Sequence, residues 1–281
     1  MIVDLKRQYV ETGVIHVPRL LDASRTARLR VISEHCLCQW RLRGGDSNPD
    51  AISMPHLNDS EYFAGSRQWL VNLLDIVADP GILAAVEEVI GGKALFRSTQ
   101  LFFNPLLTSR EGNWHRDSQF LHPNHQADDQ RVLAEANEVA NSGKTSAIQL
   151  QIALVPTDDV EYVPGSHLRL DTPDEHYIRF ADNQKYNRSN LMPGAVRTYQ
   201  QPGDAAAFNP WGLHRGRYQA EKYRRTVMLT YTHADFARLE DGFSNQPWFL
   251  SEGYLDGVKP GTKTFFEEFI KAYRHFWNVK L

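Results

Sequence analysis

The chain has 281 residues, of which 42% are hydrophobic and 23% charged, and its formal net charge at pH 7 is −3. This composition is ordinary for a globular protein, and the length is sufficient for one large core without help from metals or disulfides. A nucleic-acid-binding domain is normally strongly basic, so that class of protein is disfavoured.

Targeting and membrane signals are not evident. The first residues lack the apolar segment of a signal peptide, and no stretch approaches the roughly 18 consecutive apolar residues of a membrane span. Cys36 and Cys38 are the only cysteines, and their spacing forms no CxxC motif. We interpret them as idle thiols in a reducing compartment. We therefore expect a cytoplasmic protein that acts on a small molecule, without nucleic-acid or membrane partners. Nothing in the sequence indicates an oligomeric state.

Residues 1–92 are predicted to form a helical support. A helix, a short strand and a second helix are expected within the first 40 residues, the second helix capped by Asp22 or Ser24. Residues 41–66 have the Gly and Pro content of a long loop. The apolar spacing then predicts two further helices, which begin at Arg67 and after Pro80 and are stopped by Gly91-Gly92.

Residues 93–235 change to the alternating pattern of β-strands. Strands are expected over 98–104, 145–155, 196–200, 204–208 and 225–233. A C-terminal helix is expected over 262–279. The sequence therefore predicts one mainly β domain over 1–281: a double-stranded β-helix (a cupin-like jelly roll) buttressed by N-terminal and C-terminal helices. The chain lacks a βαβ rhythm and a GxGxxG motif, which disfavours a doubly wound nucleotide-binding fold.

A His-x-Asp pair suggests a metal site. In a strand, His115 and Asp117 would share one face, because side chains alternate with period two. A distant third histidine would complete a two-histidine, one-carboxylate set, which leaves open positions on iron(II). The sequence holds a second such pair, His233 and Asp235, but only His275 follows it. The first pair is preferred because the whole strand-rich region follows it.

His214 is the candidate for the third ligand, since it lies between the two last expected strands. Arg225 begins the second of these strands, in line with apolar residues. A buried guanidinium needs an anion opposite it, and its fork of donors suits a carboxylate. That anion could be a ligand or an Asp or Glu of the chain itself, and His214 could be a satisfied core histidine.

These residues resemble the phytanoyl-CoA dioxygenase-like family of iron(II)- and 2-oxoglutarate-dependent oxygenases. Asn113 to Asp117 resembles the family's Trp-His-x-Asp motif, and Val163 to His167 matches its Pro-Gly-Ser-His turn. Gly203-Asp204, followed by His214 and by Arg225 eleven residues later, is similar to its distal histidine and co-substrate arginine. The resemblance extends over nearly the whole chain.

The resemblance implies an enzyme with iron(II), 2-oxoglutarate and O2 as cofactor and co-substrates. The metal ligands would be His115, Asp117 and His214, with Arg225 on the far carboxylate of 2-oxoglutarate. The reaction would hydroxylate an unactivated C–H bond with release of succinate and CO2. Halogenating relatives replace the carboxylate ligand with a small residue, so Asp117 favours hydroxylation. Gln219 and Glu221 depart from the usual Asn and Ser or Thr, so the CoA-thioester substrate is not carried over.

Further contacts follow from strand alternation. Gln149 and Gln151 are expected opposite the apolar face of their strand, and Gln100 and Asn104 are similar candidates on the earlier strand. Buried glutamines need partners, which co-substrate or substrate would supply. Gln100 and Gln151 are thus candidate cofactor-binding residues; exposure at a sheet edge is the alternative.

Four arginines suggest a polar or anionic substrate, although arginines that face solvent would give the same pattern. They are Arg97, Arg116, Arg215 and Arg217. The segments 41–66, 121–144 and 171–192 are expected to cover the mouth of the site. Two other functions stay open: a cupin-like metal hydrolase or isomerase without 2-oxoglutarate, and a non-catalytic jelly-roll binding protein.

Overall fold

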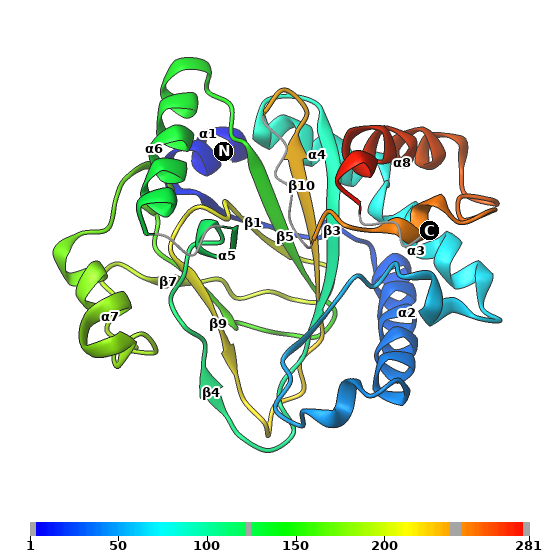
Figure 1. Cartoon of the computed structure of the whole chain (residues 1–281), viewed down its shortest axis with the longest axis horizontal. Helices are drawn as coiled ribbons and strands as arrows, with labels where there is room; N and C mark the ends of the chain where they lie inside the picture. Colours follow the sequence, from blue (N-terminus) through cyan, green and yellow to red (C-terminus); the bar gives the residue numbers. More distant parts are fainter. Residues whose placement is uncertain (1–3, 122–124, 237–242, 278–281) are drawn as a thin grey trace.

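The computed structural model describes residues 4–121, 125–236 and 243–277. Two antiparallel sheets form its centre (Figure 1). The larger has six strands in the order β1-β8-β5-β10-β3-β2, and the smaller has four in the order β4-β9-β6-β7. The strands of the larger sheet are β1 (Val14–Val17), β8 (Ala205–Phe208), β5 (Ala147–Ala153), β10 (Thr226–His233), β3 (Ala94–Phe102) and β2 (Ser53–Pro55). Those of the smaller are β4 (Arg110–Glu111), β9 (His214–Tyr218), β6 (Val160–Tyr162) and β7 (Val196–Arg197).

Helices accompany both sheets. The helices of the N-terminal third are α1 (Leu5–Thr12), α2 (Ala23–Leu42), α3 (Arg67–Val77) and α4 (Pro80–Ile90). Those of the remainder are α5 (Ser118–Leu121), α6 (His125–Ser142), α7 (Pro173–Gln184) and α8 (Pro260–Tyr273). Figure 1 shows α2, α3 and α8 gathered on one side of the larger sheet, with α6 and α7 on the other. The side chain of Asp22 caps α2 by accepting a hydrogen bond from the backbone N–H of Arg25, as the sequence predicts.

The two faces of the larger sheet have different chemistry. On β10, Val227 and Leu229 belong to the main hydrophobic core, which this face forms with the surrounding helices. Met228 and Thr230 alternate with them and line a cavity on the other face, which looks toward the smaller sheet. Antiparallel register places Met228 beside Gln151 of β5 and Gln100 of β3. The functional cavity is therefore bounded on one side by the polar face of this sheet.

The predicted elements agree with these bounds to within a few residues, with two kinds of difference. The expected strand over 196–200 is only the two-residue β7. The C-terminal helix, expected over 262–279, ends at Tyr273; residues 278 and 279 lie outside the described part of the chain. In addition, the short strands β2, β4, β6 and β9 are not among the predicted elements. The segments 121–144 and 171–192 contain α6 and α7.

Residues 67–90 are long and apolar enough, by composition, to qualify as a membrane span. In the structure this stretch is divided into α3 and α4, each of 11 residues, by a break at Ala78-Asp79. A helix of 11 residues extends about 17 Å, whereas the hydrocarbon core of a bilayer is about 30 Å thick. The stretch is half buried, and both helices contribute to the core.

Candidate metal centre and co-substrate pocket

His115 and His214 lie directly opposite each other on adjacent backbone segments. Each backbone N–H donates to the other's carbonyl oxygen at 3.0 Å, which makes an isolated antiparallel bridge at the start of β9. Their imidazole rings lie 4.3 Å apart between centroids. Two histidines separated by 99 positions in the sequence are therefore brought together by the pairing of their own backbones.

Asp117 completes a compact group with the two imidazoles. Its Oδ1 lies 3.6 Å from Nε2 of His115 and 3.4 Å from Nε2 of His214. In each histidine the other nitrogen, Nδ1, is hydrogen-bonded to a backbone carbonyl, that of Asn113 at 2.7 Å and that of Gly212 at 2.9 Å. Because Nδ1–H donates to these carbonyls, Nε2 keeps its lone pair for a ligand bond. Within the described residues, these three form the group of His, Cys, Asp and Glu suited to hold a metal ion.

The second carboxylate oxygen of Asp117 is occupied by a glutamine. Nε2 of Gln149, on β5, donates to Oδ2 at 2.5 Å. Oδ1 is thus the oxygen that faces both imidazoles, and Oδ2 is held by the sheet. This arrangement presents one carboxylate oxygen, as a monodentate ligand would.

Burial and the neighbouring charges set the protonation states of the group. Burial lowers the pKa of His115 to about 4, and the proximity of His214 lowers it further. Burial opposes ionisation of Asp117, but the neighbouring imidazoles of His214 and His115 and the hydrogen bond from Gln149 outweigh it and lower the pKa of this carboxyl. Near neutral pH His115 is neutral and Asp117 ionised, which are the states in which these side chains bind a metal.

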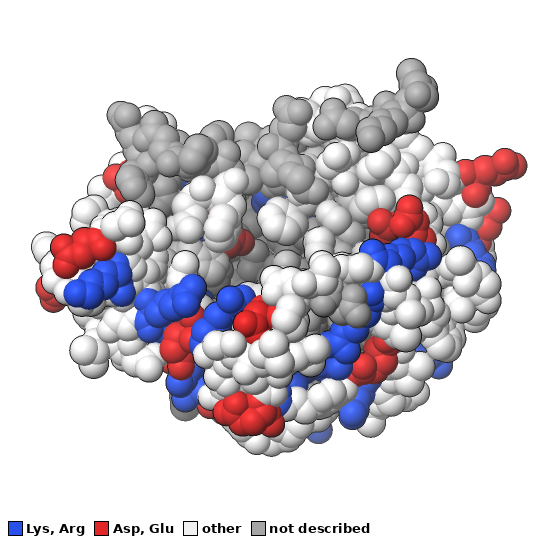
Figure 2. Space-filling view, turned by 60° about the horizontal axis from the view of Figure 1, so that its bottom comes forward, with Lys and Arg blue, Asp and Glu red and all other residues white. Residues whose placement is uncertain are grey.

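The group faces a cavity of about 420 Å³ between the two sheets. This is within the range of small-molecule sites, and its wall is mostly apolar with a few polar groups. The apolar part of the wall is formed by Phe102, Phe120, Val160, Phe208, Pro210, Trp211, Tyr218, Met228 and Phe243. The polar part includes Arg97, Ser98, Gln100, Gln149, Gln151, Arg215, Arg224 and Thr230. Figure 2 shows a hollow in the middle of the face turned toward the viewer, with basic and acidic side chains along its border.

The predicted co-substrate arginine, Arg225, is not part of this wall. Its Nε and Nη2 donate to the carboxylate of Glu34 on α2, at 2.7 and 3.2 Å. The apolar residues with which it alternates face the helices, and the anion opposite it is an acidic residue of the chain. Arg225 therefore does not line the cavity as expected, and the arginine of this pair that does is the preceding residue, Arg224.

Arg224 lies in a buried polar region at one end of the wall. Its side chain is 1% exposed, and its guanidinium stacks over the rings of Phe102 and Tyr218, at 5.5 and 5.1 Å from the centroids. Nη1 donates to the carbonyl of Arg217 at 3.1 Å, and Nε forms an ion pair with Asp159 Oδ2 at 3.4 Å without hydrogen-bond geometry. Oγ1 of Thr226 and Oε1 of Gln151 are also buried without hydrogen-bond partners among the described residues. Unpartnered buried polar atoms of this kind call for a ligand or ordered water.

The remaining predicted contacts divide into two groups. Gln100 and Gln151 both line the cavity, as expected, and Nε2 of Gln100 lies 3.4 Å from Ser53 Oγ. Asn104 does not line it, because its Nδ2 donates to the carbonyl of Lys222. The second His-x-Asp pair is apart from the metal group: Asp235 forms an ion pair with Lys144 at the surface.

The four arginines have different environments. Arg97 and Arg215 line the cavity, but Arg215 is paired with Glu161 at 2.5 Å. Arg217 pairs with Glu111, and Arg116 is buried in a hydrogen-bond network behind the metal group. The segments 41–66, 121–144 and 171–192 supply none of the described lining residues; Phe120 and Phe243 do so instead.

Two histidines and one carboxylate facing a cavity between antiparallel sheets are typical of a non-haem iron oxygenase. The model of the phytanoyl-CoA dioxygenase (PhyH) family matches residues 9–226. The chain belongs to this family, as its motifs predict, and is therefore an enzyme of the iron- and 2-oxoglutarate-dependent class. A comparison with curated protein sequences finds no match.

Solved structures share the fold. The non-haem α-ketoglutarate-dependent epimerase SnoN from nogalamycin biosynthesis is 19% identical, with a TM-score of 0.56 over 84% of this chain and 87% of that one. EctD from S. alaskensis, solved with 2-oxoglutarate and 5-hydroxyectoine, is 18% identical, with a TM-score of 0.58 over 94% and 86%. The carbocyclase SnoK from nogalamycin biosynthesis is 18% identical, with a TM-score of 0.58 over 93% and 92%. At these identities the likeness is one of fold.

Proposed function

We propose that the protein is an iron(II)- and 2-oxoglutarate-dependent dioxygenase that hydroxylates a C–H bond of a small molecule, with release of succinate and CO2. The observation that carries this proposal is the convergence of His115, Asp117 and His214 on one wall of a cavity that Arg224 also lines. Family membership and the presence of iron and 2-oxoglutarate in neighbours of the same fold support it.

The donor set fits iron(II). Two neutral imidazole nitrogens and one carboxylate oxygen would occupy one face of the metal and leave the cavity side open for co-substrate and O2. When bound, the iron supplies the activation of O2 that C–H hydroxylation requires. The chain's own residues do the rest: the carbonyls of Asn113 and Gly212 hold the imidazole tautomers, and Gln149 holds the carboxylate.

The far end of the cavity fits 2-oxoglutarate. Arg224 lines the cavity and offers a buried guanidinium to a carboxylate. Thr226, on the same face of β10 as the lining residue Met228, carries a buried hydroxyl that has no partner among the described residues. The stacking of Arg224 between Phe102 and Tyr218 fixes its orientation, so that less side-chain entropy is lost on binding. Gln151 and Gln100 face the same space from the neighbouring strands and are proposed as further contacts to the co-substrate.

The substrate is proposed to be small and polar or anionic. Arg97 lines the cavity and is proposed to take part in substrate recognition. Aromatic residues, including Phe120 and Phe243, would cover its apolar part. Figure 2 supports a small-molecule partner, because basic and acidic side chains are interspersed on this face rather than segregated into a basic patch. The epimerase and carbocyclase neighbours catalyse other reactions on this fold. Asp117 argues against halogenation, and hydroxylation is the outcome proposed here.

The architecture is proposed to be a double-stranded β-helix of the cupin type, with the metal group inside the jelly roll between the two sheets. Residues 1–92 and α8 would serve as its helical support within one catalytic domain over 1–281. A cytoplasmic location is proposed because the cofactor is ferrous iron and the two cysteines, Cys36 and Cys38, are free thiols.

The test is an anaerobic titration of the metal-free protein with iron(II) and 2-oxoglutarate, followed through the weak visible charge-transfer band of the chelate. We expect the band with the wild type and with His233→Ala, the matched control from the second His-x-Asp pair, but not with His115→Ala. Iron-loaded wild type without the band would exclude 2-oxoglutarate and favour a cupin-like hydrolase or isomerase. Failure to bind iron would favour a non-catalytic binding protein.

A further inference from the structure

Arg116 stands between the two candidate ligands of the His-x-Asp pair and faces away from the cavity. Its side chain is buried, with 1% exposure of the residue. Its guanidinium uses every one of its N–H groups. Nη1 donates to the carbonyls of Ser166 and Trp211, both at 2.6 Å. Nη2 donates to the carbonyl of Arg169 at 3.2 Å and to Asp171 Oδ1 at 2.8 Å, and Nε donates to the same carboxylate oxygen at 3.2 Å.

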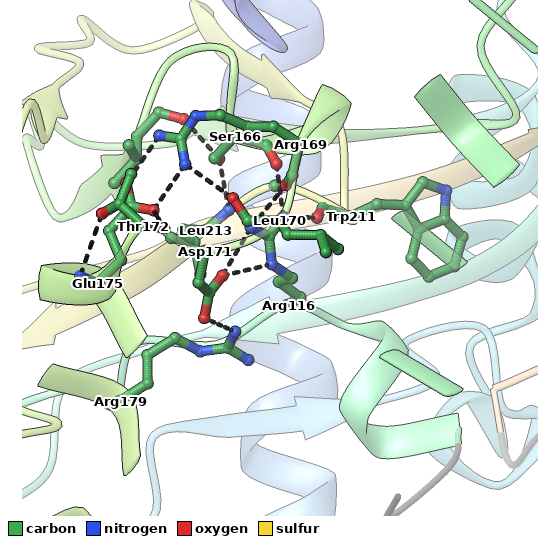
Figure 3. A network of polar contacts seen from close by, with 12 residues as sticks. Arg116, Ser166, Arg169, Leu170, Asp171, Thr172, Glu175, Arg179, Trp211 and Leu213 are labelled. Atoms are coloured by element: carbon green, nitrogen blue, oxygen red, sulfur yellow. Dashed lines mark hydrogen bonds and ion pairs between the residues drawn. The ribbon is translucent and has the colours of Figure 1, made fainter. Parts of the chain in front are cut away.

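These contacts join the two chain segments that carry the metal group. Figure 3 shows Arg116 at the centre of them, bonded to Ser166, Trp211 and Asp171. Trp211, whose carbonyl Arg116 binds, precedes His214 by three residues. The backbone N–H of Leu213, the residue before His214, donates to Ser166 Oγ at 2.8 Å. Arg116 also binds the carbonyl of Ser166. A closed circuit of hydrogen bonds therefore links the His115–Asp117 segment to the His214 segment through the Pro-Gly-Ser-His turn.

The circuit is held in place by a buried ion-pair cluster. Asp171 accepts from Arg116 through Oδ1 and from Arg179 of α7 through Oδ2, the latter at 2.6 Å. Burial opposes ionisation of Asp171, but the two guanidinium groups outweigh it and lower the pKa of this carboxyl. Both arginines are only 1 to 2% exposed. Because a buried charge without its partner is costly, the cluster leaves Arg116 little freedom to change its contacts.

We propose that Arg116 is a positioning residue that sets the spacing between the His115–Asp117 pair and His214, and thereby the affinity of the centre for a divalent metal. This inference rests on the proposed metal centre. Apart from this circuit, the two segments are tied by the His115–His214 backbone bridge, the bond from Asp117 N–H to the Pro210 carbonyl, and the pairing of β4 with β9, which continues in the bond from Gly112 N–H to the Gly216 carbonyl. These bonds fix the register of the paired backbones. Arg116, which lies behind the metal ligands, fixes the distance between the segment of His115 and Asp117 and the segment of His214. Outer contacts of this kind commonly change metal affinity 10- to 100-fold.

The experiment is an anaerobic titration of metal-free protein with Co²⁺ as the probe, read through its visible absorption, which reports both affinity and coordination geometry. The variants are Arg116→Gln and Arg116→Lys. The matched control is Arg217→Gln, on β9 three residues after His214, whose side chain pairs with Glu111 and not with the circuit. We expect Arg116→Gln to raise the Co²⁺ dissociation constant roughly 10- to 100-fold and to alter the spectrum. Arg116→Lys should recover part of the affinity, and Arg217→Gln should behave as wild type.

A purely structural role predicts a different result: a lower thermal midpoint of the metal-free protein with an unchanged Co²⁺ dissociation constant and spectrum. That outcome in folded Arg116→Gln would overturn the proposal. If Arg116→Gln does not fold, Arg116→Lys and Ser166→Ala decide, since Ser166→Ala keeps Arg116 and removes the bonds of Ser166 Oγ to Leu213 N–H and to the Val163 carbonyl. We expect each to weaken binding by about threefold or more, and unchanged affinity in both overturns the proposal. A wild type that binds no Co²⁺ or Fe²⁺ refutes the metal centre itself, a failure distinct from an unchanged constant in the variants.

Discussion

Arg224 and Arg225 are consecutive in the chain, yet their guanidinium groups belong to opposite faces of the larger sheet. Arg224 lines the cavity that holds the candidate metal group, whereas Arg225 binds Glu34 on α2. Because side chains alternate along a strand, the same substitution at these two positions removes a guanidinium from the cavity in one case and from the opposite face in the other.

The first prediction uses this pair. Arg224→Gln should raise the dissociation constant of 2-oxoglutarate in the iron-loaded protein roughly 10- to 100-fold, because a charge-assisted hydrogen bond to a buried carboxylate is lost. Arg225→Gln should leave this constant within about twofold and cost at most ~1 kcal/mol of stability, because Glu34 is 40% exposed in its side chain. The charge-transfer band of the iron chelate measures both. The reverse order of effects would restore Arg225 as the co-substrate residue.

The difference between these two arginines also marks the limit of what the sequence predicts. Alternation along the strand separates Arg224 from Arg225 correctly, but both faces of this strand are buried. The apolar residues that share a face with Arg225 suggest that this face lines the cavity. In the structure they pack instead against helices from the N-terminal and C-terminal parts of the chain. Which face is covered by helices depends on contacts across about 190 positions, such as that with Glu34, and local periodicity does not contain this information.

The candidate metal group was accessible from the sequence because its motifs are local and specific. His115 and Asp117 form one short motif, and His214 was placed by its position between expected strands. β9, which carries His214, was not predicted as a strand because His-Arg-Gly-Arg-Tyr has no apolar alternation. Arg116 was interpreted as a possible sign of an anionic substrate; its structural partners lie on segments that were expected to be loops.

The second prediction concerns the hydrogen bond from Gln149 to Asp117. Gln149→Leu removes the donor to Oδ2 and allows the carboxylate to rotate, so the metal dissociation constant should rise roughly 10- to 100-fold. Gln100→Leu is the control, because Gln100 lines the same cavity but lies beside Ser53. Anaerobic titration with iron(II) in the absence of 2-oxoglutarate measures both. Equal affinities in the two variants would show that Gln149 does not orient the ligand.

The third prediction is a pH dependence of stability that arises from His167. This imidazole is fully buried beneath α1, where Nε2 contacts the carbonyl of Val10 and Nδ1 has no partner among the described residues. Burial lowers the pKa of His167 to about 4, from about 6.5 in an unfolded chain. The unfolded state therefore binds the proton first. The buried neutral imidazole therefore contributes to the free energy of unfolding. This contribution is complete above pH 6.5, is lost progressively as the pH falls from 6.5 to 4, and amounts to roughly 3 kcal/mol.

Urea denaturation of the metal-free protein at pH 7.5, 5.5 and 4.5 measures this effect. His167→Gln should show a smaller loss of unfolding free energy than wild type across the same interval. The unfolding free energy of the variant should still fall somewhat with falling pH, because burial also lowers the pKa values of His115 and His233. An identical slope in wild type and variant would mean that His167 is charged in the folded protein or accessible to water.

The fourth prediction concerns the close approach of Gly212 to Tyr162, next to the candidate metal group. A Cβ at Gly212 would overlap the phenol ring of Tyr162, which is fully buried and donates to the carbonyl of Asn209. Neither side can move freely, because the carbonyl of Gly212 also accepts the hydrogen bond from His214 Nδ1. Gly212→Ala should therefore destabilise the protein by about 1 to 3 kcal/mol. It should also weaken iron binding, because the displaced carbonyl no longer holds the tautomer of His214.

Gly261→Ala is the matched control, since Gly261 lies in α8 and a Cβ there meets no atom within 4 Å. In a helix this exchange should be neutral or stabilise by about 0.5 to 1 kcal/mol, and iron affinity should not change. Thermal unfolding and anaerobic iron titration measure both quantities. If Gly212→Ala lowered stability but kept wild-type iron affinity, the imidazole of His214 would be held by its backbone pairing with His115 alone, and the Gly212 carbonyl would have no part in preparing the centre.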